Sequence, residues 1–397
     1  DISYISAAAI QGLDSSDLNS LTTAQVAALT TNQINNLTTD AVAGFFGSNN
    51  RINALSATQI KGLNNGQIDT FTTANIQAIK SENIAALKTS QITSLDSTQL
   101  QALKTDQIQA LTKLQAMELT ATQLPKLLTN QVAALSTQDI AAISDSKLGL
   151  LGTDQVAALK TEQIQALSTK QIVALTTKIS TWTSAQVNAL SASNLRALTA
   201  TQVKALTSVQ LPGLGTAKIA TLTSSQIAAL TSTQVRYLDS TQLTAMTAAQ
   251  IGALSSEQLN NLTTDQMGAI DGADLQRIKA SIFAGLDTAH IDALTTNQTS
   301  LLTSAQLASL ASDKLQAIAT EDLAAMTAQQ IRSLKGSQVG LLTTKQIAAL
   351  TTDQTAALTT NQRIALTTAQ IKGMTTDQVA TLSSAQVVAL STAQSSN

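Results

Sequence analysis

The sequence predicts an all-α solenoid, a superhelix of very short helices with one helix in each eight-residue repeat. Three observations lead to this prediction. The chain repeats one phrase every eight residues, as in LTTAQVAALTTNQI at residues 21–34. The polar residues of this phrase match a helix-capping pattern, and apolar residues recur at two fixed positions. A flattened β-solenoid with two octads per coil is the alternative.

The repeat keeps one register through nearly the whole chain when the leucine of each octad, such as Leu21 or Leu29, is numbered position 1. The register breaks at residues 45–55, where the spacing grows to ten through FFGSNNRINA, and at residues 175–182, where LTTKIST lacks the usual Gln. Such strictness leaves no room for a second domain or a linker. Residues 1–397 are therefore predicted to form a single continuous octapeptide-repeat solenoid. The unbroken stretches run from Ile5 to Phe45, from Leu63 to Leu175 and from Trp182 to Leu390.

The polar positions predict where each helix begins. Positions 2 and 5 spell Thr/Ser-x-x-Gln, a capping box in which the hydroxyl caps the helix and Gln reaches back to the N–H of the capping residue. Where position 2 is Lys, position 3 is Ser or Thr, so we expect a capping hydroxyl there instead. The octads of this kind contain Lys80, Lys88, Lys104 and Lys160.

The apolar positions predict the core. In one continuous helix the leucines would drift by about 80° per octad and form no face, so each octad needs its own turn. Leu at position 1 and Ile or Val at position 6 should point inward, a small position 8 should permit close approach, and positions 4 and 7 should face solvent. With two to three octads per coil, the repeats would form an elongated rod.

Two prolines oppose the helical prediction. Pro125 and Pro212 both occupy position 7, where a helix that starts at position 2 or 3 uses the backbone N–H. The Thr, Val and Ile content suits the β-solenoid alternative. Against that alternative, positions 1 and 6 would face opposite sides of a strand, and Ala and Gln are poor strand residues.

Chemistry-bearing residues are scarce. The one histidine, His290, stands at position 5 near Asp287 and Asp292, so it could be a ligand or general base. The alternative, which we favour, is that the imidazole replaces the Gln amide as a hydrogen-bonding group. There is no cysteine and no phosphate-binding loop. The sequence therefore predicts no catalytic residue, no cofactor and no metal, and a protein that is not an enzyme.

Several unusual residues are open to two interpretations. Trp182, Phe45, Phe46 and Tyr237 could be recognition aromatics, but most stand at core positions and are expected to fill space. The insertion at 45–51 is either a lateral contact or a tolerated bulge. Polar residues also stand at core position 6. These residues are Thr299, Thr355, Arg363 and Ser395. At Arg363 we expect a local shift of the register that places the next residue, Ile364, in the core. The alternative is that the four residues mark weak seams or subunit contacts.

Composition limits the possible partners. Charged residues make up 12% of the chain and the formal net charge is −2, so no basic field is available to hold nucleic acid. No run of eighteen apolar residues occurs, and we expect no membrane insertion. The opening DISYISAAAIQGL lacks the basic region of a signal peptide. The absence of cysteine is compatible with export without disulfide chemistry.

The phrases LTTAQVAALTTNQI, LTTKQIAALTTDQTAALTTNQ and LTTDQVATLSSAQVVAL resemble octad tracts of large repetitive bacterial surface and secreted proteins, described as adhesin-like or hemagglutinin-like. The resemblance covers almost the whole chain and implies an extracellular or cell-surface structural role. A shorter pattern, LTxxQVxAL, is similar to the first helix of DNA-reading repeats of plant-pathogen effectors. Those repeats are about four times as long and have a basic surface, so DNA reading is not expected here.

The sequence thus predicts a non-enzymatic structural protein that forms an extracellular or cell-surface filament, stalk or layer. Near-identical octads offer the same polar ladder at every level, so self-association with identical copies into a homo-oligomer or polymer is expected. The alternative is a solenoid binding module or adhesin that recognises a peptide, a glycan or a host ligand at the cell surface.

Overall fold

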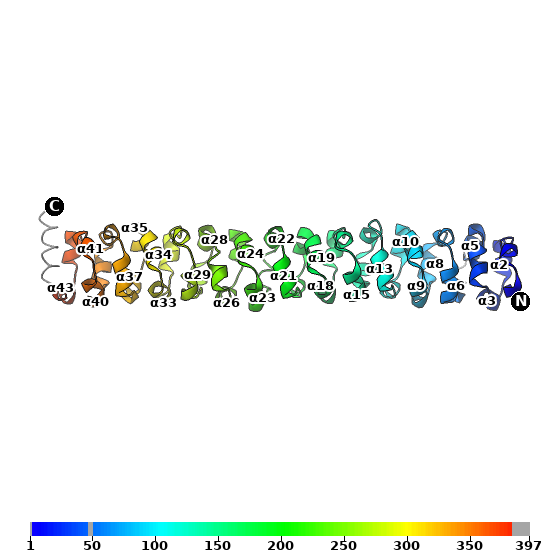
Figure 1. Cartoon of the computed structure of the whole chain (residues 1–397), viewed down its shortest axis with the longest axis horizontal. Coiled ribbons are helices and arrows are strands. Elements are labelled where there is room, and N and C mark those ends of the chain that lie inside the picture. Colours follow the sequence, from blue (N-terminus) through cyan, green and yellow to red (C-terminus); the bar gives the residue numbers. More distant parts are fainter. Residues whose placement is uncertain (1, 47–50, 383–397) are drawn as a thin grey trace. The chain divides into compact units, whose positions relative to one another are not determined.

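The computed structural model describes residues 2–46 and 51–382, and these residues are helical with no β-strand. The chain divides into two compact units, residues 1–205 (unit 1) and residues 206–397 (unit 2). Within each unit the short helices follow one another in chain order (Figure 1). The predicted all-α solenoid of very short helices is confirmed, and the β-solenoid alternative is wrong. That the two units continue as one solenoid stays a prediction.

The described residues of unit 1 form short α-helices and four 3-10 helices, and most of the α-helices lie within one octad. They are η1 (Ile2–Tyr4), α1 (Ala7–Ile10), α2 (Ser15–Ser20), α3 (Thr23–Ala27), α4 (Thr31–Asn36), α5 (Thr39–Phe45), η2 (Ile52–Ala54), α6 (Ala57–Gly62), α7 (Asn65–Asp69), α8 (Thr73–Ala78), α9 (Ser81–Ala86), α10 (Thr89–Ser94), α11 (Ser97–Ala102), α12 (Thr105–Gln109), α13 (Lys113–Glu118), η3 (Leu124–Lys126), α14 (Thr129–Ala134), α15 (Thr137–Ala142), α16 (Asp145–Leu148), α17 (Thr153–Ala157), α18 (Thr161–Ala166), α19 (Thr169–Ala174), η4 (Thr176–Thr181), α20 (Ser184–Asn188), α21 (Ala192–Ala197) and α22 (Ala200–Ala205).

Unit 2 repeats the same pattern. Its helices are α23 (Thr216–Thr221), α24 (Ser224–Ala229), α25 (Ser232–Val235), α26 (Ser240–Thr244), α27 (Ala248–Ile251), α28 (Ser256–Asn260), α29 (Thr264–Gly268), α30 (Gly272–Leu275), α31 (Ala280–Phe283), α32 (Thr288–Asp292), α33 (Thr296–Ser300), α34 (Ser304–Ser309), α35 (Ser312–Gln316), α36 (Thr320–Ala325), α37 (Ala328–Ser333), α38 (Gly336–Val339), α39 (Thr344–Ala349), α40 (Thr352–Ala356), α41 (Thr360–Ile364), α42 (Thr368–Lys372) and α43 (Thr376–Ala380).

Successive turns of the solenoid are larger than the octad pattern suggested. Helices three octads apart pack on one another, as α6 does on α9 and α36 does on α39. Hydrogen bonds between turns join residues 25, 28 and 31 apart. One turn therefore takes more than three and fewer than four octads, and the expected two to three octads per coil is wrong. The helices of one turn are thus staggered against those of the next.

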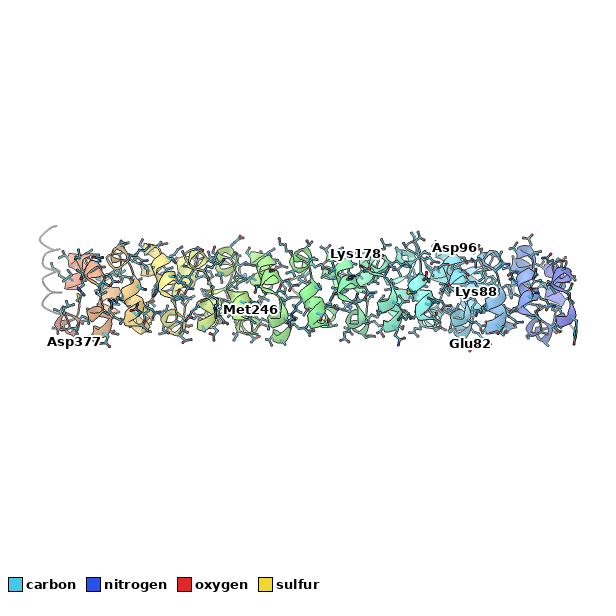
Figure 2. All side chains as sticks on the ribbon, viewed as in Figure 1. Glu82, Lys88, Asp96, Lys178, Met246 and Asp377 are labelled. Carbon is cyan, nitrogen blue, oxygen red and sulfur yellow. The ribbon has the colours of Figure 1, made fainter. Side chains whose placement is uncertain are left out.

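The core consists of positions 1 and 6, as predicted. In the octad that starts at Leu87, this leucine and Ile92 are buried, while Lys88 and Ser90 at positions 2 and 4 are exposed. A helix of five or six residues is far too short to be stable in water alone, so burial against the neighbouring turns must stabilise it. Side chains at the exposed positions cover the outer surface (Figure 2).

The prolines and the second register break change the local helix type without interrupting the path. The octad of Pro125 forms the 3-10 helix η3, and that of Pro212 forms turns. Both outcomes follow from the missing proline N–H. Residues 176–181 form η4, and there Thr176 has φ 54°, in the left-handed region. The core residues Leu124 and Ile179 remain buried in these segments.

Candidate functional site

The octad most often starts its helix with the predicted capping box. In α13 the Gln115 backbone N–H donates to the Thr112 hydroxyl at 3.3 Å, and the Thr112 N–H donates to Gln115 Oε1 at 2.8 Å. Two N–H groups that the helix leaves unpaired are satisfied in this way. The expected shift of the cap to position 3 in lysine octads is wrong. Lys88 itself precedes α10, makes no side-chain cap, and its N–H donates to Gln91 Oε1 at 2.6 Å.

The other end of the position-5 amide joins two turns. Gln107 Nε2 donates to the carbonyls of Ile76 and Ile79, both at 2.7 Å. These carbonyls lie at the end of helix α8; that of Ile76 also accepts the Ile79 backbone N–H at 3.3 Å. Gln107 is buried, and its capping bond with Lys104 is kept at 2.8 Å. One amide therefore connects the start of one helix with the end of a helix in the preceding turn.

This arrangement, which we call the amide ladder, recurs in both units. Each of its glutamines donates Nε2 to a carbonyl of the preceding turn. In unit 1 they are Gln33, Gln59, Gln67, Gln91, Gln99, Gln107, Gln115, Gln123, Gln131, Gln155, Gln163, Gln171, Gln186 and Gln202. In unit 2 they are Gln234, Gln242, Gln250, Gln258, Gln266, Gln298, Gln306, Gln330, Gln338, Gln346, Gln354, Gln362, Gln370 and Gln378.

Other donors replace glutamine in several octads. Asn83 Nδ2 donates to the Leu55 carbonyl at 2.9 Å, and Asn75 and Asn194 bond in the same way. Lys147 and Lys314 reach carbonyls of the preceding turn with Nζ. The shared property of these residues is an N–H donor on a side chain, not the amide group itself.

Both register breaks also supply a donor. Arg51, the last residue of the insertion, donates to the carbonyls of Leu18 and Leu21 at 3.0 and 3.2 Å. Lys178, in the octad without Gln, donates to the carbonyls of Gly149 and Leu151, both at 2.7 Å. The two breaks therefore keep the connection between turns through a cation.

His290 follows the same rule. Its Nε2 lies 2.8 Å from the Leu262 carbonyl, and its Nδ1 lies 2.6 Å from Asp287 Oδ1. The two ring nitrogens therefore take the places of the two contacts that a position-5 amide makes, one at its own helix start and one in the preceding turn. Burial raises the pKa of Asp287. The hydrogen bonds from His290 lower it by more than burial raises it, so the pKa lies below its ordinary value. The prediction that His290 replaces the Gln amide is confirmed, and the structure gives Asp292 no bond to the ring.

Acidic residues at position 5 break the ladder. Asp322 is buried, and burial raises its pKa above the ordinary value. The pKa of Asp274 is also raised, chiefly by burial. An ionised carboxylate has no hydrogen to donate to a carbonyl, so these octads lack the bond from position 5 to a carbonyl of the preceding turn. Asp322 instead accepts a side-chain hydrogen bond from Thr296, which lowers its pKa by less than burial raises it.

The unusual residues of the sequence mostly fill the core. Phe45, Phe46 and Trp182 are buried, and Trp182 Nε1 donates to the Val156 carbonyl at 2.9 Å; Tyr237 is half-buried. The ring centroids of Phe45 and Phe46 lie 4.8 Å apart. The Phe45 and Trp182 predictions are confirmed. Residues 47–50 of the insertion lie outside the described residues, so its role stays open.

Polar residues at position 6 remain in place. Thr299 and Thr355 are buried and donate their hydroxyls to the carbonyls of Thr295 and Thr351, both at 2.9 Å. The expected slip at Arg363 is wrong. Arg363 is itself buried, its Nη1 donates to the Leu358 carbonyl, and Ile364 is 51% exposed.

Burial lowers the pKa of Arg363, and its Nε has no hydrogen-bond partner among residues 2–46 and 51–382. Ser395 lies outside the described residues.

Within residues 2–46 and 51–382, no three His, Asp or Glu side chains gather in a way that could hold a metal ion. In the same residues no helix is both long enough and apolar enough to cross a bilayer.

Comparison with known proteins identifies the repeat. The family model described as "ALTTAQ repeat" matches residues 1–45, 76–113, 124–161, 147–177, 235–272, 315–352 and 364–392, together more than half of the chain. No curated protein gives a significant match. A solved structure titled "Structure of APUM23-GGAAUUGACGG" is similar over 98% of this chain and 93% of its own, at 10% identity and a TM-score of 0.17. A likeness at that score carries no argument.

Proposed function

The chain belongs to the ALTTAQ repeat family, and we propose that it is a non-enzymatic structural protein of a bacterial cell surface or extracellular space. In this proposal it forms a filament, stalk or layer, and identical copies associate with one another. Its resemblance to repetitive adhesin-like surface proteins supports the location. The proposal involves no cofactor, nucleic acid or membrane insertion.

The amide ladder is the observation that carries the proposal. In most octads the inward polar residue at position 5 bonds to a carbonyl of the preceding turn, as Gln107 does. Bonds of this kind resist separation of the turns, because breaking them leaves a buried amide and the position-1 carbonyl, here that of Ile79, without these partners. Stiffness along the direction of stacking is what a filament or stalk requires.

Repetition supports self-association. The outward positions 2, 3, 4 and 7 are mostly Thr, Ser, Ala and Asn along the chain, with charged residues in only some octads. Each level of the surface therefore resembles the next. Such a surface can pair with a copy of itself at many levels at once. The low charge, 12% of residues with a formal net of −2, leaves little repulsion between copies.

Electron microscopy of the purified full chain over a range of concentrations tests the proposal. We expect elongated particles that associate into filaments, bundles or layers as concentration rises. Compact globules, or particles that remain single at every concentration, would contradict it. Labelling intact cells of the source with an antibody against the chain tests the location, and exclusively internal labelling would exclude a surface role.

A binding module is the second candidate. The observation that favours it is a groove in unit 1 that carries positive charge.

A further inference from the structure

Three hollows follow one another across successive turns of unit 1. Their volumes are about 380, 600 and 370 Å³. The first two are continuous, because they share Thr58, Lys61 and Lys88 in their walls. The third shares no residue with the second, but both take a wall from α13, through Leu114 in the second and Lys113 in the third. We call this surface the lysine groove; its walls come from α4, α6, α9, α10, α13, α15 and α18 and the segments between them.

The lysine groove carries positive charge without a neutralising partner. Lys61, Lys88 and Lys113 are exposed, and the structure shows no ion pair or hydrogen bond of their ammonium groups in the described residues. No Asp or Glu lines any of the three hollows. In Figure 2, Lys88 lies between Asp96 and Glu82, which lie at opposite edges of the ribbon. The groove is therefore a positive strip on a chain whose formal net charge is −2.

The lysines are spaced by one turn of the solenoid. Lys61 and Lys88 come from successive turns, and so do Lys88 and Lys113, because bonds between turns span 25 to 31 residues. Packed helices lie about 8–10 Å apart, which places one cation at roughly that interval along the groove. A polypeptide in the polyproline II conformation advances about 3.1 Å per residue with three residues per turn, so every third side chain points the same way, at intervals of about 9 Å. A carboxylate on every third residue of such a segment would therefore meet a lysine at every turn.

The remaining walls suit a polypeptide. Leu114 is 54% exposed and lines the groove beside Lys88, so it offers an apolar contact between the charges. Asn32, Asn35 and Gln138 provide donors and acceptors for a peptide backbone. No aromatic residue lines the hollows, so the base stacking that single-stranded nucleic acids require is missing.

We propose that the lysine groove binds an extended acidic polypeptide segment that carries a carboxylate at every third residue. Lys61, Lys88 and Lys113 each pair with one carboxylate, and Leu114 contacts an apolar side chain between two of them. This gives unit 1 a binding activity in addition to the structural role, and it does not depend on that role.

Fluorescence anisotropy with the full chain tests the proposal. The probe is a labelled fifteen-residue peptide with the repeat Glu-Ala-Thr, and the comparison peptide has the same composition with all five glutamates clustered at one end. We expect the spaced peptide to bind more tightly than the clustered one, and added salt to weaken it. Equal affinity for the two peptides, or no binding of the spaced peptide, would overturn the proposal.

A matched pair of variants locates the site. The triple variant K61E/K88E/K113E should bind the spaced peptide at least about tenfold more weakly, because three ion pairs of ordinary strength become repulsive. The control K80E/K104E/K160E changes the net charge equally at three exposed lysines that line none of the three hollows. It should stay within about twofold of the parent chain, a change expected when only distant screened charges are altered.

Circular dichroism of both triple variants confirms that the fold is kept, and exposed positions make this the expected result. Equal loss of binding in the two triple variants would show a non-specific charge effect and overturn the assignment to the groove. A uronate oligosaccharide that binds in a Lys88-dependent way, while the peptide does not, would also overturn it in favour of an acidic glycan.

Discussion

Two regions of the chain share the same buried positions but differ at position 5. They are the octads of residues 87–134 in unit 1 and those of residues 270–325 in unit 2. In the first region position 5 is always Gln, and each amide bonds to the preceding turn. In the second region position 5 also includes Asp274, Ile282 and Asp322. There Leu275 and Phe283 at position 6 are still fully buried.

The difference separates two contributions to the fold. Burial of positions 1 and 6 sets the path of the chain, because the path survives where the ladder is broken. The amide ladder adds local stability, because each amide gives a hydrogen bond to a buried position-1 carbonyl, such as that of Ile79. We therefore expect residues 270–325 to open more readily than residues 87–134.

The largest effect is expected for Gln107→Glu in the unbroken region. A carboxylate at this buried site loses both bonds to the carbonyls of Ile76 and Ile79 and faces their negative ends, which costs about 3 kcal/mol. Native-state hydrogen exchange of α12 and α8 measures the local free energy of opening. Gln109→Glu is the control, because Gln109 is an exposed residue of the same octad. Equal effects of the two substitutions would show that the ladder does not matter.

Lys178→Met should have the next largest effect. It keeps the length of the side chain but removes the donor that bonds to Gly149 and Leu151 at the register break, at a cost of about 2 kcal/mol. Urea denaturation followed by circular dichroism provides the measurement. Lys170→Met is the control, since Lys170 is exposed and lies on the preceding helix, α19. An unchanged midpoint in Lys178→Met would mean that the break is held by core packing alone.

Asp322→Asn should repair a break in the ladder. Asn can donate to the Leu294 carbonyl as Asn83 does to Leu55, and stability should rise by about 1 kcal/mol at neutral pH. Because the pKa of Asp322 is raised in the folded chain, its ionisation destabilises the fold. That cost is present above the raised pKa and disappears as pH falls towards the ordinary carboxyl pKa of about 4.

The advantage of Asp322→Asn should accordingly shrink between pH 7 and pH 4 in denaturation experiments. Asp313→Asn is the control at an exposed position. A stability gain that does not vary with pH would contradict the explanation by a buried charge.

The smallest effect concerns His290. Its hydrogen bonds lower the pKa of Asp287, so this pair contributes stability that is present above the unfolded carboxyl pKa, about 4, and is lost as pH falls through the lower folded value. His290→Gln keeps a position-5 donor and removes the pair. The parent chain should lose more stability than His290→Gln between pH 5 and pH 3, by less than about 1 kcal/mol because Asp287 is half exposed. Parallel pH profiles would contradict this.

Local chemistry made much of the fold predictable from the sequence. Thr112 and Gln115 spell a capping box within one octad, and Leu87 and Ile92 mark the buried face; both depend only on residues close in the chain. The size of a turn was not predictable, because it depends on how helices three octads apart fit together. The burial of Arg363 in place of Ile364 likewise depends on neighbours in other octads.

The bond between turns was missed, although the sequence holds a signal for it. A capping box accepts Glu as readily as Gln, yet no Glu stands at position 5, and the five in the chain stand elsewhere, as Glu82 and Glu162 do at position 4. The residues that replace Gln include Asn, Lys and His, all N–H donors, and the acids found there are aspartates: Asp17, Asp139, Asp274 and Asp322. Exclusion of Glu from a capping position indicates that the amide hydrogens are used.

Hydrogen exchange of glutamine side-chain amides tests the central claim most directly. In the full chain labelled with ¹⁵N-glutamine, the Nε2 resonances of Gln107 and Gln109 can be assigned from their loss in Gln107→Glu and Gln109→Glu. If position-5 amides join successive turns, the Gln107 side-chain hydrogens exchange far more slowly than those of Gln109. Exchange of both at the rate of a free glutamine side chain would contradict the amide ladder.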